Sequence, residues 1–155
     1  MVGKVEHELE VRVPASELWE IYGGLEVGKM VTKLLPDVFE SVEVVEGDGG
    51  VGTVLNVIFP KGTSLVTYLK EKFIVIDNEK RVKVVEVIEG GFLDLGFSLY
   101  QVYLQIIEKD SKSSIIKSSI EYEVKPGSEA NASFVSIQNL QLVAEAIGKY
   151  LTEKV

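Results

Sequence analysis

The chain has 155 residues, 46% of them apolar, and this length and composition favour one domain with one sizeable core. The 16 Lys and Arg residues against 24 Asp and Glu give a net charge of −8, which repels phosphate backbones and anionic membranes, so we expect no nucleic acid and no membrane as a partner. There is no cysteine and a single histidine, which excludes thiolates and disulfides, argues against a metal site or a Ser-His-Asp triad, and leaves the chemistry to Lys, Asp, Glu and Tyr.

The beginning of the chain predicts an amphipathic strand. From Val5 to Val13 polar and apolar residues alternate without a break, which is the period of a strand with one solvated face. No run reaches the roughly 18 apolar residues of a membrane span, and no apolar signal-peptide stretch precedes the alternation. We therefore expect a cytoplasmic protein.

Two short helices are expected after this strand. Pro14 ends the alternation, and the apolar residues from Leu18 to Tyr22 have helical spacing. A Gly-Gly pair at 23–24 interrupts that helix, and the apolar residues of 27–35 predict a second one that ends at Pro36. We expect the aromatic side chains of the first helix, Trp19 and Tyr22, to pack it onto the sheet.

The middle of the chain returns to strands and its end to a helix. Short turns rich in Gly, Asp and Asn join six strand-like runs, at about 39–46, 51–59, 65–76, 81–89, 96–108 and 113–123, which predicts an antiparallel meander. Over 129–153 the apolar residues instead form a helical stripe of Phe134, Ile137, Gln141, Ala144, Ile147 and Leu151. We predict an α+β fold of one domain, residues 1–155, in which a seven-stranded curved antiparallel sheet grips a long C-terminal helix, with two short helices after the first strand.

A strongly bent sheet closed by one helix leaves a space between them, which is a candidate cavity. Alternation along the strands predicts the side chains that face this space. Most of them are apolar: Leu55, Val57, Phe59, Leu69, Phe73, Val75, Val85, Val87, Tyr100, Val102, Leu104 and Ile106. The same alternation places four polar or charged residues on this face: Glu71, Arg81, Lys83 and Ser98.

Glu71 and Lys83 stand on the two strands around the 77–80 turn, and a tight turn places them near each other across the strands. Apolar surroundings raise the pKa of a carboxyl and lower that of an amine, while their mutual attraction opposes both shifts. Such a pair is a general acid and base made without histidine. The alternative is a salt bridge on the surface of the sheet, which an error of one residue in the alternation would produce.

Two other features are expected to be structural. The glycine-rich segment 47–53 lacks the Gly-Lys-Ser/Thr ending of a phosphate loop and lies between two strands, so we interpret it as a hairpin turn. His7 lies on the apolar side of the first strand, where we expect a core histidine with satisfied hydrogen bonds.

The order of the elements and the glycine-rich turn resemble the plant birch-pollen-allergen superfamily, which includes the class-ten pathogenesis-related proteins. The resemblance covers the whole chain and implies a helix-grip fold. Several segments are more narrowly similar to the branch of norcoclaurine synthase and norbelladine synthase. They are His7-Glu8-Leu9-Glu10-Val11, Lys70-Glu71-Lys72-Phe73-Ile74, Asp77-Asn78-Glu79, Ile88-Glu89-Gly90-Gly91-Phe92-Leu93-Asp94-Leu95-Gly96, and Ile116-Lys117-Ser118-Ser119 with Glu121-Tyr122.

The resemblance also implies an activity. Norcoclaurine synthases join an arylethylamine such as dopamine to an aromatic aldehyde through an iminium, and ring closure by the catechol carbon follows. Of their four catalytic residues, the Glu falls on Glu71 and the Lys on Lys83, whereas the Tyr falls on Leu69 and the Asp on Val102. In norbelladine synthase the tyrosine stands one place earlier, which makes Tyr68 a candidate if a β-bulge turns it inward; strict alternation points it outward.

From this resemblance we expect Lys83 as the acid and Glu71 as the base, with Tyr68 as a third catalytic residue. With Val102 in place of a carboxylate, imine condensation is favoured over cyclisation. Substrate contacts are expected from Leu35, Phe39, Leu55, Val57, Phe59, Leu69, Phe73, Tyr100, Val102, Ile137 and Gln141.

The sequence leaves two classes of function open: a condensing enzyme of plant alkaloid metabolism, or a non-catalytic carrier of a hormone, flavonoid or alkaloid. The pair of charges favours the enzyme, because burying two charges costs several kcal/mol each. In both cases the partner is a small aromatic amine, aldehyde or other hydrophobic plant metabolite. We expect no cofactor, and a monomer or weak homodimer.

Overall fold

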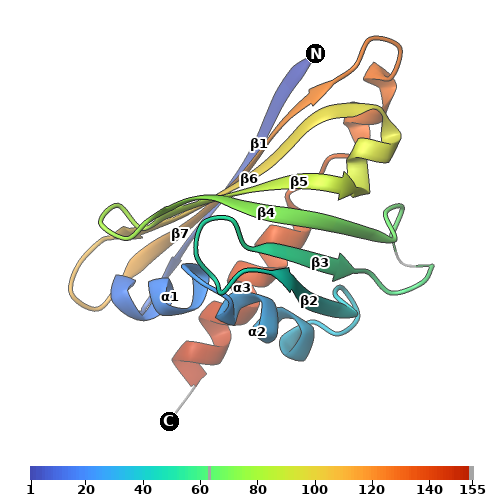
Figure 1. Ribbon diagram of the computed structural model, residues 1–155. Coiled ribbons are helices and arrows are strands. Elements are labelled where there is room, and N and C mark those ends of the chain that lie inside the picture. Colours follow the sequence, from blue (N-terminus) through green and yellow to red (C-terminus); the bar gives the residue numbers. More distant parts are fainter. Residues whose placement is uncertain (63, 154–155) are drawn as a thin grey trace.

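A seven-stranded antiparallel sheet curves around one long helix in the computed structural model, which describes residues 1–62 and 64–153 (Figure 1). In chain order the elements are β1 (Val2–Val11), α1 (Ala15–Tyr22), α2 (Glu26–Leu34), β2 (Ser41–Glu46), β3 (Val54–Ile58), β4 (Tyr68–Asp77), β5 (Val82–Gly90), the 3-10 turn η1 (Gly91–Leu95), β6 (Phe97–Glu108), β7 (Ser114–Val124), the 3-10 turn η2 (Glu129–Phe134) and α3 (Gln138–Glu153). The strands pair in the order β1-β7-β6-β5-β4-β3-β2. The predicted helix-grip architecture is confirmed.

The C-terminal helix is shorter than predicted. After η2, Val135 is extended, with φ −71° and ψ 126°, and α3 begins at Gln138. The Ser136 hydroxyl accepts a hydrogen bond from the backbone N–H of Gln138 at 3.1 Å, so a serine caps the helix after a β-branched residue that favours extended backbone. The prediction of one helix over 129–153 is therefore wrong before Gln138.

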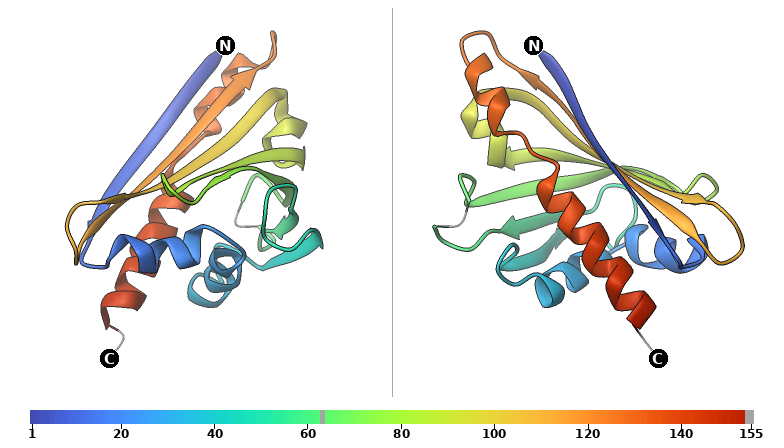
Figure 2. Two further views of the ribbon diagram at one scale, coloured as in Figure 1. Left: turned by 60° about the vertical axis from the view of Figure 1, so that its left-hand side comes forward. Right: turned by 180° about the vertical axis from the view of Figure 1, so that it is seen from behind.

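From Ala144 onward the predicted apolar stripe of α3 is confirmed. Ala144 and Ile147 are fully buried, and the helix crosses the concave face of the sheet diagonally (Figure 2). Gly148 allows the close approach to β1, because a Cβ atom there would lie only 2.8 Å from Cγ1 of Val11. Close packing at this end holds α3 against β1 and leaves its beginning free to border a cavity.

Two β-bulges interrupt the pairing of β4 with β5. Ile88 is an extra residue in β5, and Ile74 is an extra residue in β4. Beyond Ile74 the alternation is reversed, so Val75 is exposed, contrary to the prediction, and Ile76 packs against the cluster around Phe73. The expected inner face of β4 is therefore limited to the part before this bulge.

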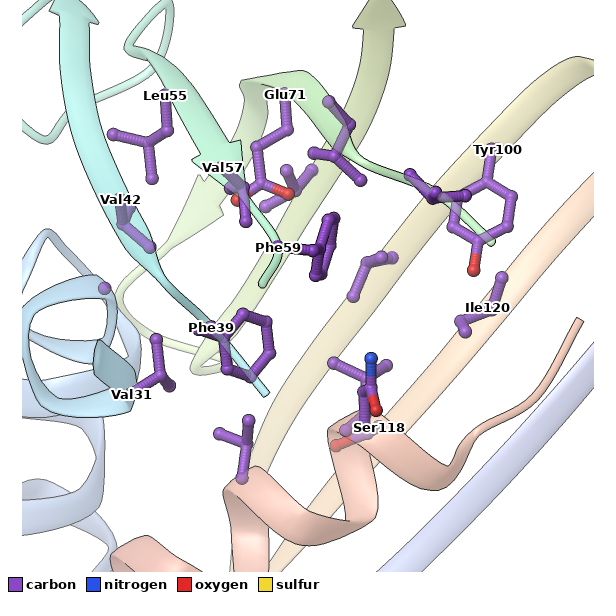
Figure 3. Close-up of a pocket in the computed structure, with 18 of the residues that line it drawn as sticks. Val31, Phe39, Val42, Leu55, Val57, Phe59, Glu71, Tyr100, Ser118 and Ile120 are labelled. Atoms are coloured by element: carbon purple, nitrogen blue, oxygen red, sulfur yellow. The ribbon is translucent and has the colours of Figure 1, made fainter. Parts of the chain in front are cut away.

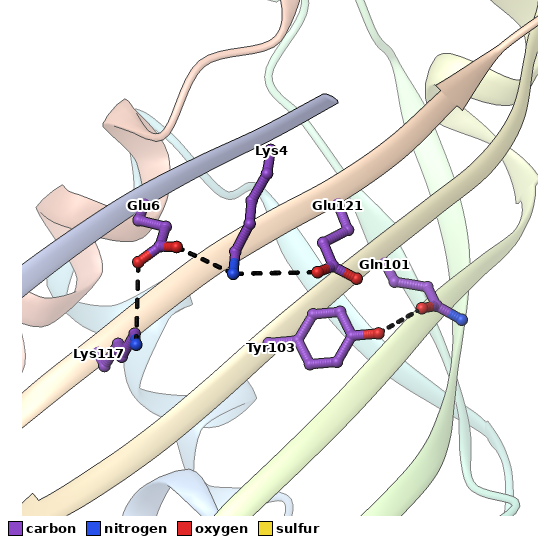
Figure 4. A network of polar contacts seen from close by, with 6 residues as sticks. All are labelled: Lys4, Glu6, Gln101, Tyr103, Lys117 and Glu121. Atoms are coloured by element: carbon purple, nitrogen blue, oxygen red, sulfur yellow. Dashed lines mark hydrogen bonds and ion pairs between the residues drawn. The ribbon is translucent and has the colours of Figure 1, made fainter. Parts of the chain in front are cut away.

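Polar side chains cover the outer face where β1, β7 and β6 lie side by side (Figure 4). The Lys4 ammonium lies 2.9 Å from Glu6 and 3.9 Å from Glu121, and Lys117 lies 3.8 Å from Glu6. Ion pairs this exposed contribute little to stability, because water screens them. They keep this face in water, so the apolar face of the sheet is the one that α3 covers.

Candidate active site

A cavity of about 410 Å³ lies between the concave face of the sheet, helices α1 and α2, and the beginning of α3 (Figure 3). Its volume is typical of small-molecule sites, which span about 300–1,000 Å³. The walls are mostly apolar and include Val31, Val42, Val85, Phe92, Ile120 and Val143. Against these walls the charged side chains of Glu71 and Lys83 stand out.

Most of the residues predicted to contact substrate line this cavity: Phe39, Leu55, Val57, Phe59, Leu69, Phe73, Tyr100 and Val102. Three do not. Leu35 packs into the main core behind α2, and Ile137 precedes α3 and packs beneath the other end of the sheet. The cavity borders α3 through Gln138, Asn139, Leu140 and Val143, and Gln141 is not among the residues that line it.

Lys83 enters the cavity from β5 and is 1% exposed. Its ammonium donates a hydrogen bond of 2.9 Å to the carbonyl oxygen of Gly24, between α1 and α2, and lies 3.8 Å from the centroid of the Phe73 ring. Burial lowers the pKa of Lys83 to about 8, although the attraction of Glu71 raises it. An ammonium has three donors, so two remain for a ligand.

Glu71 enters the cavity from β4 and is half-buried. Burial raises the pKa of Glu71 to about 7, and the attraction of Lys83 opposes this shift. Within the described part of the chain no hydrogen bond or ion pair engages its carboxylate. A free carboxyl with a pKa near neutrality is suited to general base catalysis.

Glu71 and Lys83 share the cavity but do not face each other across the strands. Glu71 is opposite Val87. Lys83 comes four residues before Val87 in β5, so the Cα atoms of these two residues lie about 13 Å apart at roughly 3.3 Å per residue. Phe73 lies between them on β4. The predicted cross-strand register is therefore wrong, and so is the alternative of a surface salt bridge.

Tyr68 lies on the outer face of the sheet. Its hydroxyl donates a hydrogen bond of 3.1 Å to the Glu89 carboxylate, and it does not line the cavity. The nearest bulge places its extra residue, Ile88, in β5, so the alternation of β4 from Tyr68 to Phe73 is unbroken. The inward orientation that a catalytic Tyr68 requires is not the one observed.

Two other tyrosines supply phenol groups to the cavity. Tyr100 lines it from β6 with its hydroxyl directed inward, and burial together with the negative charge of Glu71 raises the pKa of Tyr100 (Figure 3). Tyr22 lines it from α1, and burial raises the pKa of Tyr22. The sequence analysis missed Tyr22 and Ser118. For Ser118 a signal was present, because it is a polar residue in register with Ile116 and Ile120 on the inner face of β7.

The glycine-rich segment 47–53 is a hairpin turn between β2 and β3, as predicted. The Thr53 hydroxyl accepts a hydrogen bond of 2.8 Å from the N–H of Gly49, which has a φ of 108° that favours glycine. The expectation of a satisfied core histidine is wrong, because Nδ1 of His7 is buried without a hydrogen-bond partner. Among residues 1–62 and 64–153, no helix is long and apolar enough to span a membrane, and no group of three or more His, Asp or Glu side chains is placed to hold a metal ion.

Known proteins are similar to this chain in sequence and fold over almost its whole length. The model of the Pathogenesis-related protein Bet v 1 family matches residues 1–154. Norbelladine synthase of Narcissus pseudonarcissus is 47% identical over 154 residues, which cover 99% of this chain and 94% of that protein. S-norcoclaurine synthase of Thalictrum flavum subsp. glaucum is 42% identical over 156 residues, with 96% and 70% covered.

A solved structure agrees with these relatives. Norcoclaurine synthase from Thalictrum flavum in complex with dopamine and hydroxybenzaldehyde superposes with a TM-score of 0.89 at 39% identity, covering 100% of this chain and 89% of that one. The resemblance to the norcoclaurine and norbelladine synthase branch is therefore confirmed. With a matching family model, relatives of this identity and the same curved sheet around a C-terminal helix, the chain belongs to the Pathogenesis-related protein Bet v 1 family.

Proposed function

We propose that this protein is an enzyme of plant alkaloid metabolism that condenses an arylethylamine with an aromatic aldehyde. The observation that carries the proposal is a carboxyl with a pKa of about 7 and an ammonium with a pKa of about 8 in one apolar cavity. The similarity to a norbelladine synthase, and to a norcoclaurine synthase with dopamine and hydroxybenzaldehyde bound, supports this class of substrates.

Glu71 acts first in this mechanism. An arylethylamine is mostly protonated in water at neutral pH, and only its neutral form has a lone pair for attack. The Glu71 carboxylate accepts the proton from the bound ammonium, so the amine nitrogen becomes a nucleophile in contact with the aldehyde carbon. The apolar walls hold the two aromatic rings and exclude water that competes for the aldehyde.

Lys83 acts on the oxygen that leaves. Its ammonium donates a hydrogen bond to the aldehyde oxygen and then a proton, which gives a carbinolamine when the C–N bond has formed. The nitrogen then returns a proton to the neutral Lys83 amine, and the re-formed ammonium protonates the hydroxyl, which leaves as water while the nitrogen lone pair forms the C=N bond. The remaining N–H proton of the iminium passes back to Lys83. The Gly24 carbonyl fixes the ammonium during these steps, and the net reaction is amine plus aldehyde to imine plus water.

Consumption of an amine–aldehyde pair tests this function. We expect imine formation from tyramine or dopamine with 4-hydroxybenzaldehyde to be faster with the protein than in buffer, measured by reducing the imine and quantifying the secondary amine by mass spectrometry. Heat-denatured protein is the control. Saturable ligand binding without acceleration of any pair would contradict the enzyme and favour the carrier.

Val102 points to release of the imine rather than cyclisation. It lines the cavity opposite Val85, where an aliphatic side chain cannot accept the ring proton that a cyclisation must lose. Val102→Asp should therefore increase the cyclised share of product from dopamine and an aryl acetaldehyde by about tenfold or more, measured by chromatography. Val102→Asn is the matched control, because it is polar without being basic, and equal cyclisation by both variants would contradict the assignment.

The surroundings of the reaction are part of the proposal. The net charge of −8 supports small-molecule substrates over nucleic acid or an anionic membrane. The lack of cysteine fits the reducing cytoplasm, where structural disulfides are rare. We propose a cytoplasmic enzyme that works without a cofactor, as a monomer or weak homodimer.

A further inference from the structure

We propose that the hydroxyl groups of Ser118 and Tyr22 form a second polar subsite in the cavity, which binds the ring hydroxyl of a phenolic aldehyde. The inference rests on the proposed function for the identity of the ligand as an aldehyde. Its geometry stands independently, because it concerns two side chains that neither the acid nor the base role uses.

Both hydroxyls are buried in the cavity wall without a partner. Ser118 and Tyr22 are each 1% exposed and both line the cavity, yet neither oxygen has a hydrogen-bond partner in the described part of the chain. Buried hydroxyls in folded proteins are almost always hydrogen-bonded, since leaving one unpaired is unfavourable. Two unpaired hydroxyls that line the same cavity indicate that a ligand supplies the missing partner.

The position of Ser118 relative to Lys83 indicates which substrate this ligand is. Lys83 on β5 is opposite Leu104 on β6, and Leu104 is opposite Ser118 on β7, so the three form one row across the inner face. Two strand spacings separate the ends of this row, about 10 Å between Cα atoms. The row leads away from β4 and Glu71. An aldehyde with its oxygen at Lys83 and its ring over Leu104 therefore directs its ring hydroxyl toward Ser118.

Tyr22 approaches the same row from α1. It packs in the apolar cluster that contains Leu104, and Gly24, the partner of the Lys83 ammonium, follows it by two residues. His7, opposite Ser118 on β1, has a further buried nitrogen without a partner. Of the buried side-chain atoms without a partner in the described residues, those of Ser118 and His7 thus lie at the end of the row remote from Glu71, that of Tyr22 is on the helix that packs against Leu104, and that of Asn56 is on β3.

The chemistry of the two hydroxyls suits a phenol. Serine and tyrosine hydroxyls both donate and accept hydrogen bonds, as a phenol does, so either direction of the bond can be made. An aldehyde without the ring hydroxyl leaves both groups unpaired in the complex. Sites that hydrogen-bond a substrate hydroxyl discriminate against the analogue that lacks it for this reason.

The test compares 4-hydroxybenzaldehyde with benzaldehyde at a fixed amine. Wild type should prefer the hydroxylated aldehyde in kcat/KM, and Ser118→Ala and Tyr22→Phe should each reduce that preference, the ratio of the two kcat/KM values, by about tenfold. Ser98→Ala and Tyr103→Phe are matched controls, because their hydroxyls bond to the Glu123 carbonyl and to the Gln101 side chain on the outer face, and both should keep the wild-type preference.

A binding measurement separates this inference from the proposed function. The unreactive amides 4-hydroxybenzamide and benzamide keep the carbonyl oxygen and the ring, and calorimetric titration gives their affinities whether or not any pair turns over. Loss of the preference for 4-hydroxybenzamide in both variants supports the subsite even if the enzyme assay fails. An unchanged preference, or an equal loss of affinity for both amides, overturns it. The subsite is also overturned if the two variants lose the preference for tyramine over phenethylamine and keep the preference for the hydroxylated aldehyde, because the hydroxyl groups would then bind the amine.

Discussion

Lys83→Met is expected to lower kcat for imine formation by about 10²–10⁴-fold, the usual effect of removing a positioned acid, with a smaller effect on ligand affinity. Methionine retains most of the apolar stem of Lys83, but it lacks the ammonium that lies over the Phe73 ring and so has neither a proton to donate nor a positive charge at the departing oxygen. Steady-state kinetics with a saturating amine separate kcat from KM.

Stability and a surface control make this result specific. The variant removes a buried ammonium with a depressed pKa, so its free energy of unfolding at pH 7 should equal or exceed that of wild type. Tyr68→Phe, which removes a hydroxyl from the outer face of neighbouring β4, should change kcat by less than about twofold. Wild-type turnover of every pair by Lys83→Met, with ligand binding retained, would identify the protein as a carrier.

Regular alternation and short turns made most of the fold predictable. The six runs between Phe39 and Tyr122 all became strands of the antiparallel sheet, because each has one apolar face and ends at residues that favour turns. The break before Gln138 was not predictable from periodicity, since the stripe continues through Ile137 and only the serine cap interrupts it. The spacing of apolar residues shows which face of a helix is buried, but it does not show where the helix begins, because that depends on local hydrogen bonds such as the one that Ser136 accepts.

The candidate site was predictable as far as strand alternation holds. Glu71 and Lys83 reach the cavity because the bulge of each strand lies outside the stretch that contains them. Alternation is unbroken over 69–73 in β4 and over 83–87 in β5. Their separation was missed because the turn sets the register: Asp77 pairs with Val82, which places Glu71 near Val87, and the extra residue Ile74 shifts this register by only one residue. Tyr22 was missed for a different reason: a helix aromatic that packs and one that lines a cavity have the same sequence pattern.

Glu71→Gln is expected to lower kcat/KM by about 10²–10⁴-fold at pH 7.5 and to change the pH profile. In wild type the profile should rise near pH 7, as Glu71 loses its proton, and fall near pH 8, as Lys83 loses its own. Because Glu71 and Lys83 interact, the two midpoints are apparent pKa values of the pair and not of either residue alone. The amide removes the rise. Because the charge of Glu71 raises the pKa of Lys83, the fall should move to lower pH in the variant.

Stability should change in the opposite direction from activity. The pKa of Glu71 is raised from 4.5 to about 7 on folding, so the folded state binds this proton more tightly and wild-type stability falls as pH rises through that window. Glu71→Gln lacks this fall and should exceed wild type by about 1–2 kcal/mol at pH 8, less than the full shift implies because Glu71 is half-buried beside a cavity. At pH 4 the two should agree, measured by urea unfolding at both pH values. If the variant is less stable than wild type at pH 8, the Glu71 carboxylate stabilises the folded state. The assignment of Glu71 as a base whose pKa is raised by burial would then fail.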